Sequence, residues 1–256
     1  MRYYLKFTVL LTIAVSAILG ILSMKNNPHV KSYKSFEPVA VIELFTSQGC
    51  SSCPSADKLL SQTIETAKNK DQKIFALSYH VDYWNRLGWS DPFSNKLYSQ
   101  RQYEYVNKLS LNGAYTPQMV VNGIYEFVGS DSRALSRAIS GALNTNAIIN
   151  FKILSAEISG KAVRVKFLTE GNSISSFINF ALVSLNETTD IKRGENGGLS
   201  LKNENVVRQL ISQNFSASGE IEFVPQPDQS AENTAVIAFI QDKNNYKILG
   251  AAMTRL

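Results

Sequence analysis

The chain has 256 residues, of which 44% are hydrophobic and 18% are charged. This composition is typical of an ordinary globular protein, and the length suffices for one large domain or two smaller ones. The 26 basic and 21 acidic residues leave a formal charge of +5, and no basic run with interleaved aromatic residues is visible. The sequence therefore argues against nucleic-acid binding.

The first segment in chain order has the form of an export signal. Arg2 and Lys6 precede an uncharged, mostly apolar run at 7–24, and a basic start followed by an apolar core is typical of such signals. No clean Ala-x-Ala cleavage site precedes Lys25, and the run is close to the lower limit of about 20 residues for a membrane span. A cleaved signal, an inner-membrane anchor and a buried helix all remain open. The first two predict an exported protein, periplasmic or secreted, in a compartment where disulfides persist.

Cys50 and Cys53, the only cysteines of the chain, follow an apolar run at 41–45 and a short polar turn. Apolar residues then recur with helical spacing over 56–67, so the pair is predicted where a strand meets a helix. Unpaired N–H groups and the positive dipole end at a helix start lower the pKa of a thiol, which for Cys50 predicts a value below the free one of ~8.5. Cys-x-x-Cys beside a βαβ pattern is typical of a thioredoxin-like redox motif.

The cysteine pair has three further interpretations. A static disulfide is one, although a two-residue loop removes little entropy from the unfolded chain. A four-ligand zinc site lacks ligands, since only His29 and His80 are available, whereas copper(I) held by two thiolates and His80 suits soft ligands. We favour redox chemistry without cofactor or metal, in which an exposed Cys50 attacks and Cys53 resolves the mixed disulfide. The expected partners are proteins or small molecules that carry thiols or disulfides.

The second buried strand is predicted at 73–79, after the helix. A strand–helix–strand unit implies a parallel pair, whose carboxyl ends meet at one sheet edge and place His80 near Cys50. A charged His80 would lower the pKa of the thiol, while a histidine merely satisfied at the strand end is the alternative. Asp82 is expected to orient His80 or to bind a partner, and Trp84 to form an aromatic rim or to pack within its loop.

Two more residues are assigned to the site from their strands. If Glu43 faces inward from the first strand, its desolvated carboxylate would accept the Cys53 proton; if it faces outward, it has no such role. Thr116-Pro117 opens the third predicted strand, where thioredoxin-like folds carry a cis-proline that faces the cysteines; a trans proline in an edge strand is the alternative. The assigned residues are Cys50, Cys53, Pro117, His80 and Glu43 for catalysis, and Thr116, Asp82 and Trp84 for substrate binding.

The rest of the first half adds a helix over 93–109, a hairpin at Asn122-Gly123 and a helix capped by Ser130. The order β-α-β-α-β-β-α up to about residue 146 predicts an α/β, thioredoxin-like fold with a helical insertion. A mostly β region follows, as a sandwich or an added sheet. Within it the pattern at 206–210 does not distinguish strand from helix, and Arg193–Gly198 is an ordinary charged turn or a docking segment.

These elements divide the chain into four parts. They are a signal peptide or membrane anchor at 1–24, a linker at 25–38, a thioredoxin-like domain at 39–148 and a β-rich C-terminal domain at 149–256.

The segment Glu43-Leu44-Phe45-Thr46-Ser47-Gln48-Gly49-Cys50-Ser51-Ser52-Cys53-Pro54 resembles the signature of a thioredoxin-like family of exported bacterial proteins, catalogued as a domain of unknown function. The further matching segments are His80-Val81-Asp82-Tyr83-Trp84, Leu87-Gly88-Trp89, Asp91-Pro92-Phe93, Arg101-Gln102, Tyr115 to Val121, Phe127 to Ser130, Arg193 to Asn196 and Asn205 to Val207. Ser55 departs from the pattern, because members usually carry a second proline there. The resemblance runs from about residue 39 to the C-terminus; it implies a thioredoxin-like domain with a β-rich extension and supplies no substrate.

Overall fold

A computed structural model describes residues 35–171 and 175–256 of the chain. The leader expected at 1–24 lies outside the described residues, as do residues 25–34 of the expected linker. Within the described part of the chain, no helix is both long and apolar enough to cross a membrane.

The strand, turn and helix around the cysteines form as the hydrophobic pattern predicts. In chain order the elements up to residue 143 are β1 (Ala40–Thr46), α2 (Cys53–Asn69), β2 (Ile74–His80), the 3₁₀ turn η1 (Asn85–Leu87), α3 (Lys96–Lys108), β3 (Gln118–Val121), β4 (Tyr125–Val128) and α4 (Ser132–Leu143). β1 is buried along its whole length and pairs in parallel with β2, so that Thr46 is in register with His80. β3 pairs antiparallel with β1 and forms the predicted hairpin with β4.

Two helices begin slightly later than the sequence pattern suggests. The side chain of Asn95 accepts a hydrogen bond from the backbone two residues ahead, so α3 begins at Lys96 and not near Phe93. Asp131, and not Ser130, caps α4, because its carboxylate accepts from the N–H groups two and three residues ahead. In both cases the residue that satisfies the unpaired N–H groups of the first turn decides where the helix begins.

The C-terminal half is β-structure, as expected. Its elements are β5 (Asn150–Ser159), β6 (Ala162–Glu170), β7 (Ser176–Asp190), β8 (Ser200–Asn214), β9 (Ser218–Phe223), the 3₁₀ turn η2 (Ala231–Asn233), β10 (Thr234–Asp242) and β11 (Ile248–Arg255). The undecided segment at 206–210 is a strand, because it lies inside β8 and pairs with β7.

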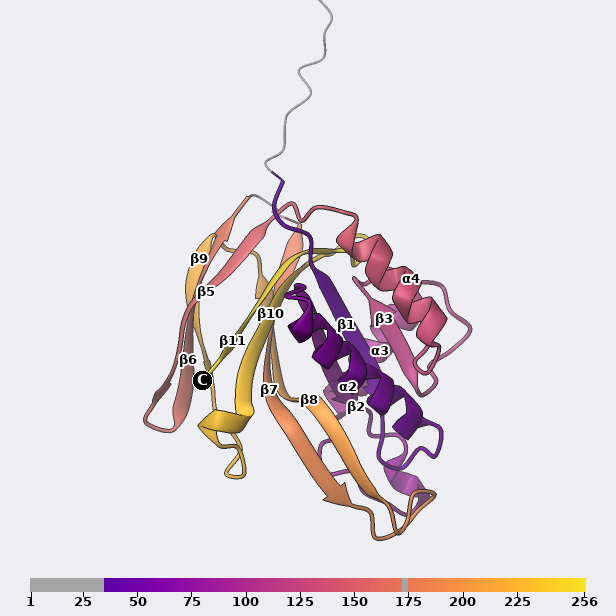
Figure 1. Ribbon diagram of the computed structural model, residues 1–256. Helices are drawn as coiled ribbons and strands as arrows, with labels where there is room; N and C mark the ends of the chain where they lie inside the picture. Colours follow the sequence, from indigo (N-terminus) through magenta and orange to yellow (C-terminus); the bar gives the residue numbers. More distant parts are fainter. Residues whose placement is uncertain (1–34, 172–174) are drawn as a thin grey trace, which may run out of the picture. The chain divides into compact units, whose positions relative to one another are not determined.

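The sheet continues across the boundary that we placed near residue 149. In the described residues, a central sheet of eight strands has the order β11-β10-β7-β8-β2-β1-β3-β4, and β5, β6 and β9 form a separate small antiparallel sheet. The join is a parallel pairing of Ser78 in β2 with Val206 in β8. The fold is therefore a mixed α/β arrangement whose C-terminal strands extend the sheet of the first half (Figure 1).

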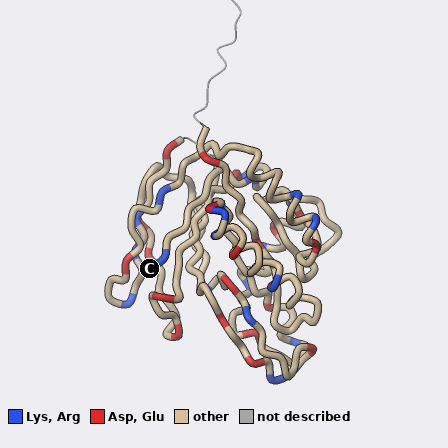
Figure 2. The backbone as a smooth tube through the Cα atoms, viewed as in Figure 1, with Lys and Arg blue, Asp and Glu red and all other residues tan. Residues whose placement is uncertain are grey.

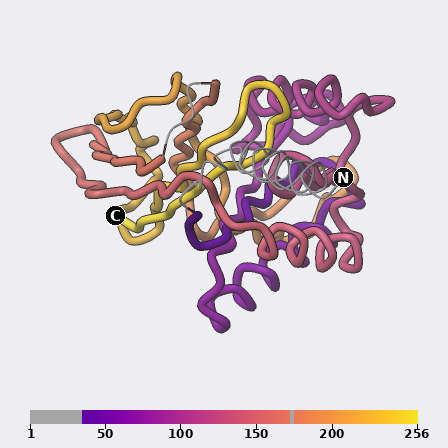
Figure 3. The backbone as a smooth tube through the Cα atoms, turned by 90° about the horizontal axis from the view of Figure 1, so that it is seen from above, coloured from indigo at the N-terminus to yellow at the C-terminus, as the bar shows by residue number. Residues whose placement is uncertain are grey.

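Alternate residues of the strands serve different cores. Ile42 and Leu44 of β1 pack with α2 and α4, whereas Phe45 packs with aromatic residues of α3. In β7 and β10, one set of alternate residues joins the core beneath α3 and the other packs against the small sheet. Figure 3 shows the connection between β10 and β11 beside α3, where the Lys108 amine donates to the Asn244 carbonyl over 3.0 Å. The C-terminal strands thus contribute to the core of the first half.

Candidate functional site

Cys50 and Cys53 form a disulfide at the start of α2, with their Cα atoms 5.4 Å apart. Cys53 is the first residue of the helix, and Pro54 occupies an early position where a missing N–H costs no helical hydrogen bond. Cys50 lies in the preceding turn, with its sulfur 3.3 Å from the Ser52 hydroxyl. The pair therefore stands at the positive end of the helix dipole, as the sequence predicts.

The prediction that Cys50 is exposed is wrong, because both cysteines have a relative exposure of 0%. The loop between β7 and β8, residues 191–199, which we call the clamp loop, reaches this turn from the strands beside β2 in the sheet. The Asn196 amide donates to the carbonyl oxygens of Gln48, over 2.9 Å, and of Cys50, over 3.0 Å. The clamp loop thus holds the cysteine turn directly.

A second contact of the clamp loop reaches the residue between the two cysteines. The Ser51 N–H donates to the Glu195 carboxylate over 3.0 Å. Hydrogen bonding from the Ser51 side chain, together with this N–H, lowers the pKa of Glu195. The loop is itself braced by backbone hydrogen bonds, among them Gly198 N–H to the Ile191 carbonyl. Of the two interpretations of the segment 193–198, docking onto the first half is therefore the one that the structure shows.

Trp84 connects the cysteine turn with the proline loop. Its indole N–H donates to the Thr116 hydroxyl over 2.8 Å, and a Cβ atom placed on Gly49 would lie 3.4 Å from the Cβ of Trp84. The Thr116–Pro117 peptide bond is cis, as expected, and Pro117 is buried. Trp84 and Thr116 thus lie on the same side of the molecule as the disulfide and are coupled to each other.

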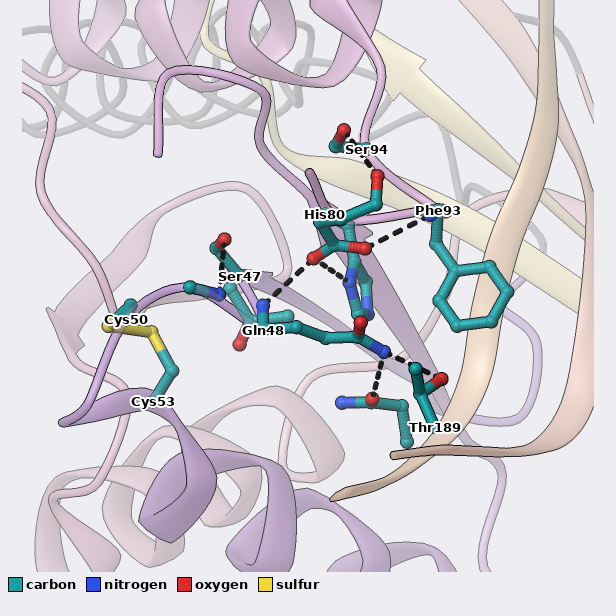
Figure 4. Close-up of polar contacts among 12 residues, drawn as sticks. Ser47, Gln48, Cys50, Cys53, His80, Phe93, Ser94 and Thr189 are labelled. Atoms are coloured by element: carbon teal, nitrogen blue, oxygen red, sulfur yellow. Dashed lines mark hydrogen bonds and ion pairs between the residues drawn. A yellow bond between two sulfur atoms is a disulfide. The ribbon is translucent and has the colours of Figure 1, made fainter. Parts of the chain in front are cut away.

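His80 is fully buried and forms an ion pair with Asp91, Nδ1 to Oδ2, over 2.8 Å. Burial alone would lower the pKa of His80, but the charge and hydrogen bond of Asp91 raise it above its ordinary value. Burial would likewise raise the pKa of Asp91, but His80 and backbone N–H groups lower it. One of these N–H groups is that of Gln48, which lies two residues before Cys50 (Figure 4). Each partner of the pair therefore favours the charged form of the other, and the pair is linked to the cysteine turn through the Gln48 backbone.

A buried carboxyl group, Asp57, lies on α2 one helical turn after Cys53, and its Oδ2 accepts a hydrogen bond from Thr46 over 3.3 Å. Because Thr46 and His80 are in register on adjacent parallel strands, their side chains leave the sheet on the same face, toward α2. Burial raises the pKa of Asp57 to about 7, despite the lowering effect of His80. Among the described residues, Asp57 Oδ1 and His80 Nε2 are buried without a hydrogen-bond partner.

Glu43 points to the opposite side of β1. Its carboxylate accepts hydrogen bonds from Arg101 of α3, over 2.5 and 2.9 Å, and from the Tyr105 hydroxyl. It is 1% exposed and ion-paired. The structure thus places Glu43 inside, but against α3, whereas Asp57 lies on the α2 side with Cys53. Strand alternation decides this, since Leu44 and Thr46 occupy the α2 face.

The prediction that Asp82 orients His80 is wrong, because the partner of His80 is Asp91. The chain turns toward α3 after β2, and the Ser99 hydroxyl donates to the Asp82 carboxylate over 2.5 Å. Copper(I) at the cysteines and His80 has no support from the geometry either. In the part of the chain that the structure describes, no three His, Cys, Asp or Glu side chains converge as metal ligands require.

The sequence did not reveal Asp57, Asp91, Gln48 or Asn196 as site residues. For Asp57 a signal existed, because a carboxylate four residues after Cys53 falls on the buried face of the helix. Asp91 and Asn196 lie in turns, and no periodicity marks their partners. Only the tertiary structure brings Asp91 and Asn196 to the cysteine turn.

Comparison with known proteins places the chain among sequences without an assigned activity. The family model described as a protein of unknown function, DUF1223, matches residues 41–241. The crystal structure of protein AGR_C_4864 from Agrobacterium tumefaciens is 26% identical, with a TM-score of 0.63, over 87% of this chain and 98% of that one. A domain of the outer membrane lipoprotein Omp28 from Porphyromonas gingivalis is 16% identical over 42% of this chain and 87% of that one, with a TM-score of only 0.26. No curated protein matches significantly.

Proposed function

Because the chain belongs to the DUF1223 family of proteins of unknown function, we propose a function from its site: a thiol–disulfide oxidoreductase of the cell envelope that acts through Cys50 and Cys53. The observation that carries this proposal is a Cys-x-x-Cys disulfide at a helix start, with the buried carboxyl of Asp57 one turn along the same helix. A structural disulfide needs no ionisable group beneath it, whereas thiol exchange needs a proton acceptor.

The chemistry begins from the reduced pair. The Cys50 thiolate attacks one sulfur of a substrate disulfide, which forms a mixed disulfide and releases the first substrate thiolate. Cys53 then transfers its proton to Asp57 and attacks the Cys50 sulfur, which releases the second substrate thiolate and restores the enzyme disulfide. A carboxyl with a pKa of about 7 can accept this proton and return it near neutral pH.

The neighbouring residues have supporting roles in this proposal. His80 and Asp91 hold a charge pair beside Asp57 and tune its proton affinity. A substrate segment would bind next to the sulfurs against Thr116, Pro117 and Trp84, once the cover over the disulfide has moved. The substrates are proteins or small molecules with thiols or disulfides. The basic and apolar leader at 1–24 supports export, by a cleaved signal or a membrane tether.

One observation favours a second candidate, a thioredoxin-like binding module with a static disulfide. Neither cysteine has exposed surface, so exchange requires the clamp loop or Trp84 to move away. In a static module this cover would be permanent, and the cysteine pair would only brace the turn.

Turnover of a disulfide-containing model protein by the full-length chain, in the presence of dithiothreitol, separates the candidates. The oxidoreductase predicts faster exchange with the wild type, none above background with Cys50→Ser, and covalently trapped substrate with Cys53→Ser. Asp57→Asn, which keeps both cysteines, should slow resolution of the mixed disulfide by Cys53 by roughly 100-fold or more at pH 7. A disulfide that resists dithiothreitol in the folded protein, with wild-type rates equal to those of Cys50→Ser, would establish the static module.

A further inference from the structure

We propose that the clamp loop, through Glu195 and Asn196, stabilises the disulfide form of the pair over the dithiol form and so biases it toward reducing substrate disulfides. This inference rests on the proposed function and assigns it a direction of electron flow. It starts from an arrangement in which a loop of the β-rich half carries a carboxylate to the residue next to Cys50.

The position of the Glu195 carboxylate opposes a negative charge on Cys50. Its oxygen accepts the N–H of Ser51, one of the backbone donors that surround the start of α2. In the reduced protein the Cys50 thiolate needs the positive potential of this helix start for its stability. The Glu195 carboxylate already lies at this helix start, so it repels the thiolate and raises the free energy of the dithiol state.

The clamp loop contains charges of both signs, so its net charge does not decide the effect. Figure 2 shows acidic and basic residues at the end of the β7–β8 hairpin. Lys192 lies in the same loop but pairs with Asp190, at 3.9 Å. What distinguishes Glu195 is its hydrogen bond to the cysteine turn. Because its side chain is exposed, the repulsion is modest and is screened by salt.

Asn196, the residue after Glu195, fixes the clamp loop on the cysteine turn. It is 3% exposed, and its two hydrogen bonds hold the carbonyls of Gln48 and Cys50 in the oxidised conformation. Because Cys50 has no exposed surface, an external thiol reaches its sulfur only after the clamp loop or Trp84 moves, and the two hydrogen bonds of Asn196 oppose movement of the loop. The clamp loop therefore slows reduction of the disulfide as well as disfavouring its product.

The reaction favoured by this bias balances without a metal or cofactor. The two thiols of the reduced pair lose two electrons and two protons as their disulfide forms. The substrate disulfide takes up both and becomes two thiols. Another cycle requires a reductant that regenerates the reduced pair. We expect this partner to be a dithiol that acts outside the cytoplasm.

The test is the equilibrium between disulfide and dithiol in the full-length protein, set against dithiothreitol or glutathione buffers. Glu195→Gln keeps an oxygen that accepts the Ser51 N–H and removes only the charge. We expect a three- to tenfold shift toward the dithiol, or about 15 to 30 mV, which shrinks at high salt. Lys192→Gln, which alters one charge of the same loop, should leave the equilibrium within about twofold. Asn196→Ala should speed reduction by dithiothreitol at least about tenfold, because the hydrogen bonds are lost.

An equilibrium that Glu195→Gln leaves unchanged, or moves toward the disulfide, would overturn the inference. So would an equal shift with Lys192→Gln, which would mark the effect as one of general charge. These measurements need no substrate protein, so they stay distinct from the test of function. If the redox equilibrium shifts as expected but no substrate is turned over, the effect of the clamp loop on the disulfide is supported and the proposed oxidoreductase function is not.

Discussion

His80 Nδ1 lies 2.8 Å from Asp91 Oδ2, and neither side chain has exposed surface. Because removing one partner leaves a buried, uncompensated charge, Asp91→Asn should lower the free energy of unfolding by about 3 to 5 kcal/mol. The raised pKa of His80 makes this stabilisation complete below about pH 6.5 and lost as the pH rises through the folded value. The lowered pKa of Asp91 makes it present above about pH 3.8 and lost as the pH falls through its folded value.

Urea unfolding of Asp91→Asn and the wild type from pH 4 to 9 checks this expectation. The difference should be largest between about pH 4 and 6.5. Asp190→Asn is the control, since that side chain is 70% exposed and its partner is 3.9 Å away; its stability should match the wild type. A pH-independent difference would contradict an ion pair between His80 and Asp91.

Asp57 should make the protein less stable as the pH rises from about 4 to 7. Its folded pKa of about 7 lies above the unfolded value of 3.8, so in this window the folded chain binds a proton that the unfolded chain releases. Asp57→Asn removes this loss, which is at most about 4 kcal/mol. Thermal unfolding across this pH range should show a flatter profile for the variant, and parallel profiles would refute a raised pKa at Asp57.

The buried pair of Glu43 and Arg101 should be strongly coupled. Arg101→Met leaves the Glu43 carboxylate without its ionic partner and should cost about 3 to 5 kcal/mol, whereas adding Glu43→Gln should recover part of that loss. Arg164→Met is the control, because Arg164 and Glu222 form an exposed pair, and it should cost less than about 1 kcal/mol. Denaturant midpoints provide the comparison, and additive single and double variants would argue against the coupling.

Gly123 should not tolerate a side chain. Its φ is +73°, and a Cβ atom there would lie 1.9 Å from the carbonyl oxygen of Tyr246. Gly123→Ala should therefore cost about 2 kcal/mol or more, or prevent folding, because both the backbone and a neighbouring strand connection resist it. Gly113→Ala, whose Cβ meets nothing within 4 Å, should fold with nearly normal stability. Circular dichroism and urea titration distinguish the two; equal stabilities would be inconsistent with this packing.

Much of the first half was predictable because its order depends on local patterns. The apolar run before the cysteines, the helical spacing after them and the Asn122-Gly123 turn each determine their own element. The parallel pairing of β1 and β2 then follows from the short crossover. His80 could be placed at the cysteine edge on this basis alone, but its partner Asp91 could not, because that residue lies in an irregular turn.

The sequence by itself determined the elements around the cysteine pair and the edge of the sheet where the chemistry is placed, since hydrophobic periodicity and chain connectivity act over short distances. Only the tertiary structure decided that Glu43 faces α3 and that Asn196 donates a hydrogen bond to the Cys50 carbonyl. These outcomes depend on strand alternation and on the joining of β8 to β2, through Ser78 and Val206. Residues more than a hundred positions apart meet there, and no local pattern encodes their register.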